Sequence, residues 1–321
     1  MAFLDAGATL RSDISAVVNE AASADQMFIG QLVLPVWTVN ERAGQWPKFR
    51  LTKGELLNDD ATKRTPGASY GKVVRAYESD TFTTEDIGLE EAVDDTYKAD
   101  VARYFDAEAT AAKQIRTQVQ LNHEIAAAAA VMNTTNFGSG ASPLVDYTEA
   151  NIATINLVGD ITAAVTVLNN KGVIPNTIVM SKNVFARARR STLFLNYLRG
   201  TMGNGADRLA NAQDIANVFA ADGITNCYVG RMPKNSAKKG ATYSAASVWG
   251  DTYIWVGRVE SGDPMAGGAG RTVVWSKEGG LFVAETYRSD ERRSDIVRVR
   301  SHYVCKAIDG TAGALITTTY S

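Results

Sequence analysis

The chain has 321 residues, of which 45% are hydrophobic and 21% charged, a composition typical of a globular protein with roughly two domains. Its 33 basic and 35 acidic residues leave a net charge of −2, so the protein has no overall positive field that would attract nucleic acid or acidic lipid. This balance disfavours a sequence-reading nucleic-acid-binding protein, although charges segregated onto one face would still allow local contacts with a polyanion.

The cysteines and the apolar runs indicate the compartment. Cys227 and Cys305 are the only cysteines, too few for a disulfide framework and without the spacing of a metal site, so we expect core thiols in a reducing compartment. The first residues lack the basic and apolar regions of a signal peptide, and the longest apolar run, residues 125–132, is far shorter than the roughly 20 residues of a membrane helix. We therefore expect no membrane association and a protein that is made in the cytosol.

The N-terminal region predicts a short amphipathic arm. Its apolar side chains are spaced for one face of a helix, and that face needs a partner: Leu10, Ile14, Val17 and Val18. Residues 36–52 follow, with the bulky and β-branched side chains that are typical of a strand.

A long hairpin is predicted next. Residues 53–70 are polar and are punctuated by Pro66 and Gly67, whereas residues 71–84 alternate bulky and charged side chains. Limbs of about 12 to 18 residues, at about 3.3 Å per residue, would reach about 40 to 60 Å. Because an isolated two-stranded hairpin is only marginally stable in water, we expect this one to rest on a neighbouring subunit.

The strongest helical pattern spans residues 95–132. Asp94 and Asp95 are good capping residues, and small or apolar side chains then recur at helical spacing: Val101, Phe105, Ala109, Ala112, Ile115, Val119 and Ala126. At about 1.5 Å per residue this predicts a rod of more than about 50 Å with a narrow stripe suited to lying on a sheet. A coiled coil is the alternative, but no heptad is sustained.

The loop at residues 133–143 is the best domain boundary, and the chain beyond it has an α/β pattern. We predict helices at 149–170, 182–198 with Ser181 as cap, and 211–220. Strands are predicted at 177–180, 226–232, 247–256, 271–275 and 295–308.

Three motifs suggest chemistry, and each lacks a required part. Ser69 fits G-x-S-x-G, but neither a strand before it nor a helix after it supplies the nucleophile elbow, and the same stretch lacks the residue count of a phosphate-binding loop. His123 begins H-E-x-x-H, but Ala127 replaces the second histidine, so we interpret His123 as a surface residue of the helix. Residues 203–205 lack the third glycine of a dinucleotide site. We therefore predict no catalytic residue, no cofactor and no metal.

Two arginine clusters are candidates for contacts. One lies on a predicted helix at Arg187, Arg189 and Arg190. The second is interleaved with acidic residues, which favours a salt-bridged subunit contact over a DNA-facing patch: Arg288, Arg292, Arg293, Arg298 and Arg300.

Four stretches, taken in order, carry a resemblance to a known family. RTPGASYGKVVRAYESDTFTTEDIGLEEAVDD looks like an extended loop that returns into a long helix, and PNTIVMSKNVFARARRSTLFLNYLRG looks like a strand and helix of an α/β domain. IANVFAADGITNCYVGRM and VWGDTYIWV look like the helix and strands that follow. Together they resemble the major capsid proteins of tailed phages over essentially the whole chain.

This resemblance implies an α+β protein with the phage capsid fold. Its parts would be an N-terminal arm at 1–44, an extended hairpin loop at 45–86, a peripheral domain with a spine helix at 87–142, an α/β axial domain at 143–270 and a return to peripheral strands at 271–321. It implies a structural protein of the virion capsid, assembled in the host cytoplasm from pentamers and hexamers into an icosahedral shell around double-stranded DNA. The other partners would be a portal and a decoration protein. Because no long charged N-terminal extension is present, the resemblance implies either a separate scaffolding protein or a chain that has been matured.

We expect inter-subunit contacts from the arm residues given above, from Arg292 and Arg293, and from charged residues of the loop: Lys53, Glu55, Asp59, Asp60, Lys63 and Arg64. Some relatives cross-link a loop lysine to an asparagine, but nothing here identifies the partners, so we do not predict it. The alternatives are an encapsulin-like nanocompartment that encloses cargo enzymes and, from another class, a hydrolase using Ser69.

Overall fold

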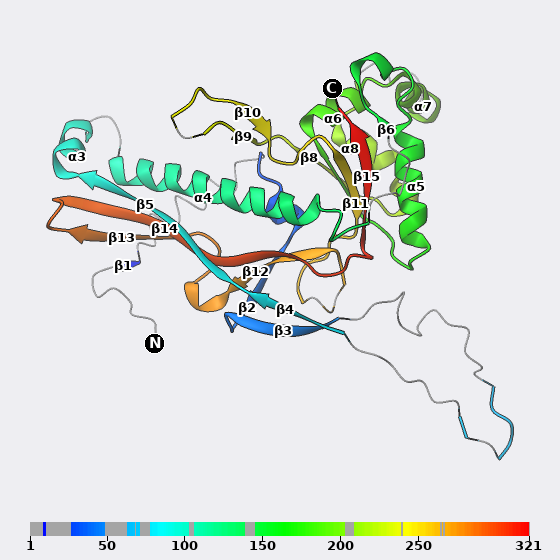
Figure 1. Ribbon diagram of the computed structural model, residues 1–321, viewed down its shortest axis with the longest axis horizontal. Helices are drawn as coiled ribbons and strands as arrows, with labels where there is room; N and C mark the ends of the chain where they lie inside the picture. Colours follow the sequence, from blue (N-terminus) through cyan, green and yellow to red (C-terminus); the bar gives the residue numbers. More distant parts are fainter. Residues whose placement is uncertain are drawn as a thin grey trace.

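The computed structural model is built on two larger sheets, with one long helix that runs from the first toward the second (Figure 1), and its described residues also form two two-stranded ribbons. It describes residues 9–10, 27–48, 63–67, 69–70, 78–102, 106–138, 145–202, 209–238, 240–263, 265 and 267–320. The first sheet and the long helix form an elongated half, and the second sheet with its helices forms an α/β half at the other end.

The first sheet is built around the long strand β14 (Ser294–Ala307). Its strand order is β1 (Thr9–Leu10), β13 (Val283–Ser289), β14, β12 (Gly270–Trp275) and β2 (Val36–Val39), and β5 (Glu85–Asp94) also pairs with β14. All these pairs are antiparallel except β12 with β2. The strand predicted at 295–308 is thus confirmed, whereas β5 and β13 were not predicted.

Helix α4 (Ala107–Val131) covers one face of this sheet. The predicted stripe is confirmed at Ala112, Ile115 and Val119, which are buried against Val297 and Val299 of β14. Its other residues are only partly buried, at Val101, Ala109 and Ala126, or lie outside the described residues, at Phe105. Because alanine side chains are small, the axis of α4 can approach the strands closely, and the helix contacts the sheet over a long distance without large side chains between them.

The single helix predicted at 95–132 is wrong at its first turns. The structure has a separate helix α3 (Asp95–Val101), capped by Asp94, and a new start at Asp106. Asp106 has an extended backbone, and its carboxylate accepts hydrogen bonds from the N–H groups of Glu108 and Ala109. A carboxylate that binds these free N–H groups favours a helix start over continuation.

The base of the predicted hairpin is confirmed. Strands β3 (Ala43–Lys48) and β4 (Glu78–Thr83) pair antiparallel, from Ala43 opposite Thr83 to Lys48 opposite Glu78. Farther out, Pro66 and Gly67 form a turn, as expected, and Gly67 has the positive φ of 86° that favours glycine. The length predicted for the limbs depends on residues outside the described ones.

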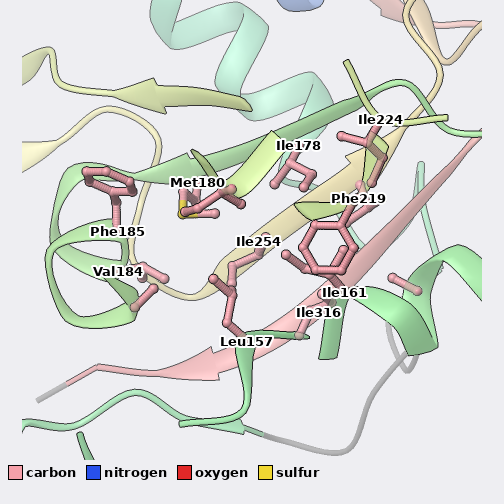
Figure 2. Packing of buried hydrophobic residues seen from close by; sticks show 14 of the residues in the cluster. Leu157, Ile161, Ile178, Met180, Val184, Phe185, Phe219, Ile224, Ile254 and Ile316 are labelled. Atoms are coloured by element: carbon pink, nitrogen blue, oxygen red, sulfur yellow. The ribbon is translucent and has the colours of Figure 1, made fainter. Parts of the chain in front are cut away.

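The second sheet has the order β6 (Val145–Asp146), β15 (Gly313–Thr319), β11 (Tyr253–Gly257), β7 (Thr177–Ser181) and β8 (Asn226–Gly230). Around it lie α5 (Leu157–Asn169), α6 (Lys182–Ala188), α7 (Thr192–Met202) and α8 (Ala212–Val218). Figure 2 shows the core between them, where Leu157 and Phe219 of the helical layer pack against Ile178, Ile254 and Ile316 of the strands. Residues 271–321 therefore contribute strands to both sheets rather than to the first alone.

Several boundaries in this half differ from prediction. The helix predicted at 149–170 begins as a 3-10 turn (Glu149–Asn151), and α5 starts only after its cap Asn156. Ser181 caps α6 as expected, but the helix predicted through 198 is divided at Ser191, whose hydroxyl accepts a hydrogen bond from the N–H of Phe194 in α7 and donates one to the carbonyl of Ile155. The strand predicted at 247–256 is split into β10 (Ala245–Ser247) and β11 by a turn with Gly250 at φ 62°.

Candidate subunit-contact surfaces

The arm and loop residues expected to make contacts fall mostly outside the described chain. This is so for Ile14, Val17, Val18, Lys53, Glu55, Asp59 and Asp60. Leu10 is described, and the helix predicted for it is wrong: it lies in β1 and pairs with Glu285 of β13. An edge strand offers unpaired backbone groups, which here are satisfied by a short strand from the N-terminal region.

The hairpin turn presents two cations to solvent. Lys63 and Arg64 are exposed, and the guanidinium of Arg64 lies 5.0 Å from the ring centre of Tyr70, which is itself 70% exposed. This pair is a basic, aromatic surface of the kind that binds acidic partners. Ser69 lies beside this pair and is exposed. Both histidines are buried in the elongated half, so the described residues do not supply a histidine base for Ser69.

The base of the hairpin is fixed to the first sheet by aromatic packing. Trp46 and Phe82 are buried and stacked with ring centres 5.8 Å apart, and Trp37 of β2 meets both edge-on. Lys306 of β14 also bonds Asp80 at 3.1 Å. The direction in which the hairpin leaves the sheet is therefore set by a packed root.

A buried carboxylate joins three parts of the chain. Glu124 of α4 is 1% exposed. Its oxygens accept hydrogen bonds from the backbone N–H groups of Ile29 at 3.0 Å and Gly30 at 2.6 Å, and from the indole N–H of Trp249 at 2.6 Å. A buried carboxyl group of this kind is tolerated because both of its oxygens accept hydrogen bonds. Sequence reasoning missed this junction, since its members are about a hundred residues apart.

His123 is not the surface residue that the sequence predicted. It is 1% exposed, lies 3.1 Å from the Thr272 hydroxyl and meets the rings of Phe282 and Tyr303 edge-on. Burial lowers the pKa of His123 to about 4, so the ring is neutral at neutral pH. The described residues contain no group of three or more ligating side chains that could hold a metal ion.

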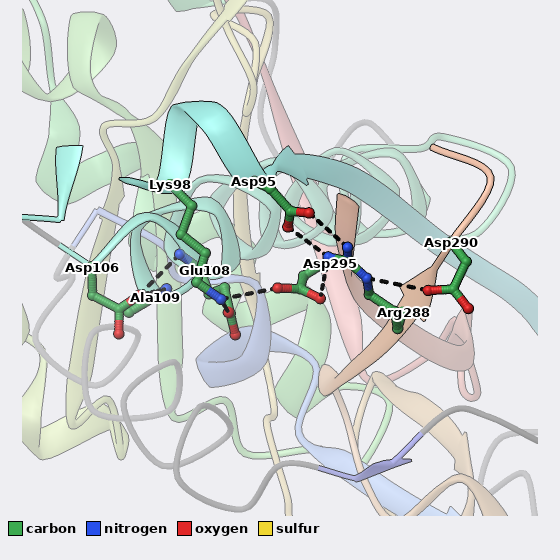
Figure 3. A network of polar contacts seen from close by, with 8 residues as sticks. All are labelled: Asp95, Lys98, Asp106, Glu108, Ala109, Arg288, Asp290 and Asp295. Atoms are coloured by element: carbon green, nitrogen blue, oxygen red, sulfur yellow. Dashed lines mark hydrogen bonds and ion pairs between the residues drawn. The ribbon is translucent and has the colours of Figure 1, made fainter. Parts of the chain in front are cut away.

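The second arginine cluster is engaged mostly within the chain (Figure 3). Arg288 makes two parallel bonds to Asp95, at 2.6 and 2.7 Å, and a third at 3.2 Å to Asp295. Lys98 bonds both Glu108 and Asp295. The hydrogen bonds that Lys98 donates to the carboxylates of Glu108 and Asp295 raise the pKa of Lys98. This network fastens α3 to the β13–β14 hairpin within one copy, and the subunit contact expected for Arg288 stays a prediction.

Other arginines of the two clusters are either paired with acidic residues of the same chain or exposed at a turn. Arg298 and Arg300 form salt bridges with Glu285 of the same chain, and the subunit contact expected for them stays a prediction. Arg190 bonds Glu149. Arg292 and Arg293 are exposed at the turn between β13 and β14, where Arg293 has a φ of 47°.

Comparison with solved structures relates this architecture to shell proteins. The chain superimposes on a phage-related protein from Bordetella bronchiseptica with a TM-score of 0.69, at 20% identity over 96% of this chain and 97% of that one. It superimposes on a chain of the cyanophage P-SCSP1u capsid with a TM-score of 0.58, at 10% identity over 90% and 87%. The chain has the phage capsid fold. The resemblance stated from the sequence is thereby confirmed at the level of the fold.

The phage capsid fold of this chain is shared by a particle from an archaeon. A virus-like particle from Pyrococcus furiosus matches with a TM-score of 0.55, at 9% identity over 94% of this chain and 97% of that one. No protein-family model matches the sequence, and no curated protein matches it. In the described part of this capsid-fold chain, no helix has the length and apolar character needed to cross a bilayer.

Proposed function

We propose that this protein is the major capsid protein of a tailed phage, a structural protein whose activity is self-assembly into an icosahedral shell around double-stranded DNA. The observation that carries the proposal is the match of nearly the whole chain to a phage-related protein and to a phage capsid chain. Such a match does not depend on a motif, since it extends over both sheets and the helix between them.

The described surface supports an assembling role. The β3–β4 hairpin leaves the sheet on a packed root and ends in a turn with exposed Lys63, Arg64 and Tyr70. A two-stranded hairpin gains stability only by covering another surface. In a shell, each copy would supply that surface to the next, so that many modest contacts reinforce one another around closed rings.

In this proposal each part has a role in the shell. Helix α4 would be the spine of a peripheral domain, the second sheet the core of an axial domain, and the hairpin an extended loop lying over a neighbouring copy. Pentamers and hexamers would be joined by the arm residues, the charged loop residues and the exposed pair Arg292 and Arg293. A scaffolding protein, a portal and a decoration protein would complete the particle, and no catalytic step is proposed.

An encapsulin-like nanocompartment is the second candidate, favoured by the match to the Pyrococcus furiosus particle. The two candidates differ in content. Purified particles treated with nuclease would retain double-stranded DNA if the chain forms a phage capsid, and a protein cargo if it forms a compartment.

Sedimentation velocity and negative-stain electron microscopy of the concentrated protein test the proposal. The experiment is done with the chain alone and with the companion proteins encoded beside it. We expect rings and closed shells of uniform diameter. A species that stays monomeric under all these conditions would contradict the proposal.

A further inference from the structure

A second, shorter hairpin projects from the α/β half (Figure 1). Its strands β9 (Pro233–Asn235) and β10 (Ala245–Ser247) pair antiparallel. We call residues 231–247 the basic hairpin. No other strand pairs with β9 or β10 within the described chain, so both edges of this ribbon are open.

The tip of the basic hairpin is held in one shape. The side-chain oxygen of Asn235 accepts hydrogen bonds from the N–H of Ala237 at 3.0 Å and of Ser244 at 3.1 Å. The Ser236 hydroxyl also lies 3.1 Å from the Ser244 hydroxyl. A preorganised element loses little entropy when it binds a partner.

The root of the basic hairpin is anchored in the core. Trp249, two residues after β10, is 1% exposed and donates its indole N–H to Glu124 of α4. Gly230, just before the hairpin, lies against this ring, where a Cβ would come within 2.3 Å of the indole. The ribbon is therefore set at a fixed position relative to the long helix.

The charge of this hairpin has a single sign. Residues 223–250 contain no acidic residue and four basic ones: Arg231, Lys234, Lys238 and Lys239. Arg231 and Lys238 are exposed, and Tyr243 near the tip is 62% exposed. A basic surface with an exposed aromatic ring fits an acidic partner with some apolar area.

The same chain carries a segment of opposite sign. Residues 76–97 contain no lysine or arginine and eight acidic residues: Glu78, Asp80, Glu85, Asp86, Glu90, Glu91, Asp94 and Asp95. Most of β5 is exposed, including Glu85, Glu91 and the apolar Leu89 at 39%. Within the described residues β5 pairs only with β14, which leaves its other edge open. No hydrogen bond or ion pair links the basic hairpin to β5 in the described part of one copy.

We propose that the basic hairpin of one copy binds the acidic strand β5 of a second copy. The inference rests on the proposed function and names a specific contact for it. Opposite charges and open strand edges on two different surfaces of one chain make a head-to-tail contact, which closes into rings when the rotation permits. Double-stranded DNA is the less favoured partner, because it would meet only the charge of the basic hairpin, whereas β5 offers both opposite charge and an open strand edge.

Charge reversal and its rescue test this contact. The variant Lys234→Glu/Lys238→Glu and the variant Glu85→Lys/Glu91→Lys should each lower the yield of shells at least tenfold, and a chain carrying all four changes should recover most of it. The matched control, Lys113→Glu/Lys182→Glu, changes two lysines outside both surfaces and should assemble normally. Thermal melting by circular dichroism of each unassembled variant checks that it is folded.

The outcomes separate the contact from the proposed function. If wild type forms shells and the reversed variants do so equally, or the fourfold variant is not rescued, the contact is wrong and the shell function stands. If reversed variants form shells that lose only their nuclease-protected DNA, the hairpin binds nucleic acid and the contact is again wrong. If wild type never assembles, both proposals fail.

A disulfide trap gives a second measurement that does not depend on charge. The double variant Lys238→Cys/Glu91→Cys, assembled and then oxidised, should form covalent dimers and higher ladders, whereas either single variant should not. The native thiols of Cys227 and Cys305 do not interfere, because burial raises their pKa to about 12 and keeps them protonated. Assembled shells that yield no ladder would overturn the contact.

Discussion

The carboxylate of Glu124 accepts a hydrogen bond of 2.6 Å from the indole N–H of Trp249 in the protein interior. The same carboxylate accepts hydrogen bonds from the N–H groups that begin α2 (Gly30–Val33). One side chain thus connects the N-terminal region, the long helix and the root of the basic hairpin.

Replacement of Glu124 should destabilise the fold. Glu124→Gln presents an amide to three donors, and at least one of them is left without an acceptor, so we expect the free energy of unfolding to fall by about 3 kcal/mol. Urea denaturation measures it. Lys113→Ala on the exposed face of the same helix is the control and should stay within about 0.5 kcal/mol of wild type.

A double-mutant cycle with Trp249→Phe isolates the indole bond. If Glu124 and Trp249 are coupled as the geometry indicates, the coupling energy should be about 1 to 3 kcal/mol. Strict additivity would show that the bond contributes nothing to stability.

Gly230 should not accept a side chain. A Cβ there would lie 2.3 Å from the buried ring of Trp249, so Gly230→Ala must displace the ring and should cost about 1 to 3 kcal/mol. Gly200→Ala in α7 is the matched control, since nothing lies within 4 Å of its Cβ position, and it should be neutral or slightly stabilising. Differential scanning calorimetry of both variants checks the contrast, and equal melting temperatures would contradict it.

His123 should make the protein sensitive to acid. Its pKa in the folded chain, about 4, lies below the ordinary value of 6.5, so the unfolded chain binds more protons between these two values. Stability is therefore complete above about pH 6.5 and declines by about 3 kcal/mol as the pH falls to about 4. His123→Gln should remove most of that slope in urea titrations at several pH values.

The second buried histidine, His302, also contributes to this pH dependence. Burial also lowers the pKa of His302, so it contributes a slope of the same sign, and the His123→Gln variant should keep part of the acid sensitivity. A slope unchanged by His123→Gln would contradict the buried, neutral state of this histidine.

The network of Figure 3 should contribute modestly and in a salt-dependent way. Asp295→Asn removes the carboxylate that bonds Lys98 and Arg288. Because these partners are partly exposed, we expect a small fall in melting temperature in dilute buffer that largely disappears in about 1 M NaCl. A large fall in melting temperature that persists in high salt would contradict this expectation, because it would show that salt does not screen these ion pairs.

Local chemistry made much of the fold predictable. The strand β7 and the helix α8 lie close to where they were predicted, at 177–180 and 211–220, and Asn211 forms a capping box with Asp214 at the start of α8. The helix break at Asp106 was missed because the hydrophobic period continues across it. The new helix starts there because the Asp106 carboxylate accepts hydrogen bonds from the first N–H groups of α4.

The candidate contacts were less predictable, since they depend on tertiary neighbours. Arg288 was expected at a subunit contact, but the fold brings it to Asp95, which is 193 residues away. His123 could have been predicted as buried, because it continues the spacing of Ile115 and Val119 on α4. The burial of Glu124 could not, since it requires the N-terminal region and Trp249 to meet on a second side of the helix.

Cryo-electron microscopy of the particle formed by this chain tests the central claim most directly. The account predicts a closed icosahedral shell in which copies form pentamers and hexamers, and the basic hairpin of one copy meets β5 of the next. A particle built from another chain, or a protein that remains monomeric with all its companion proteins present, would contradict it.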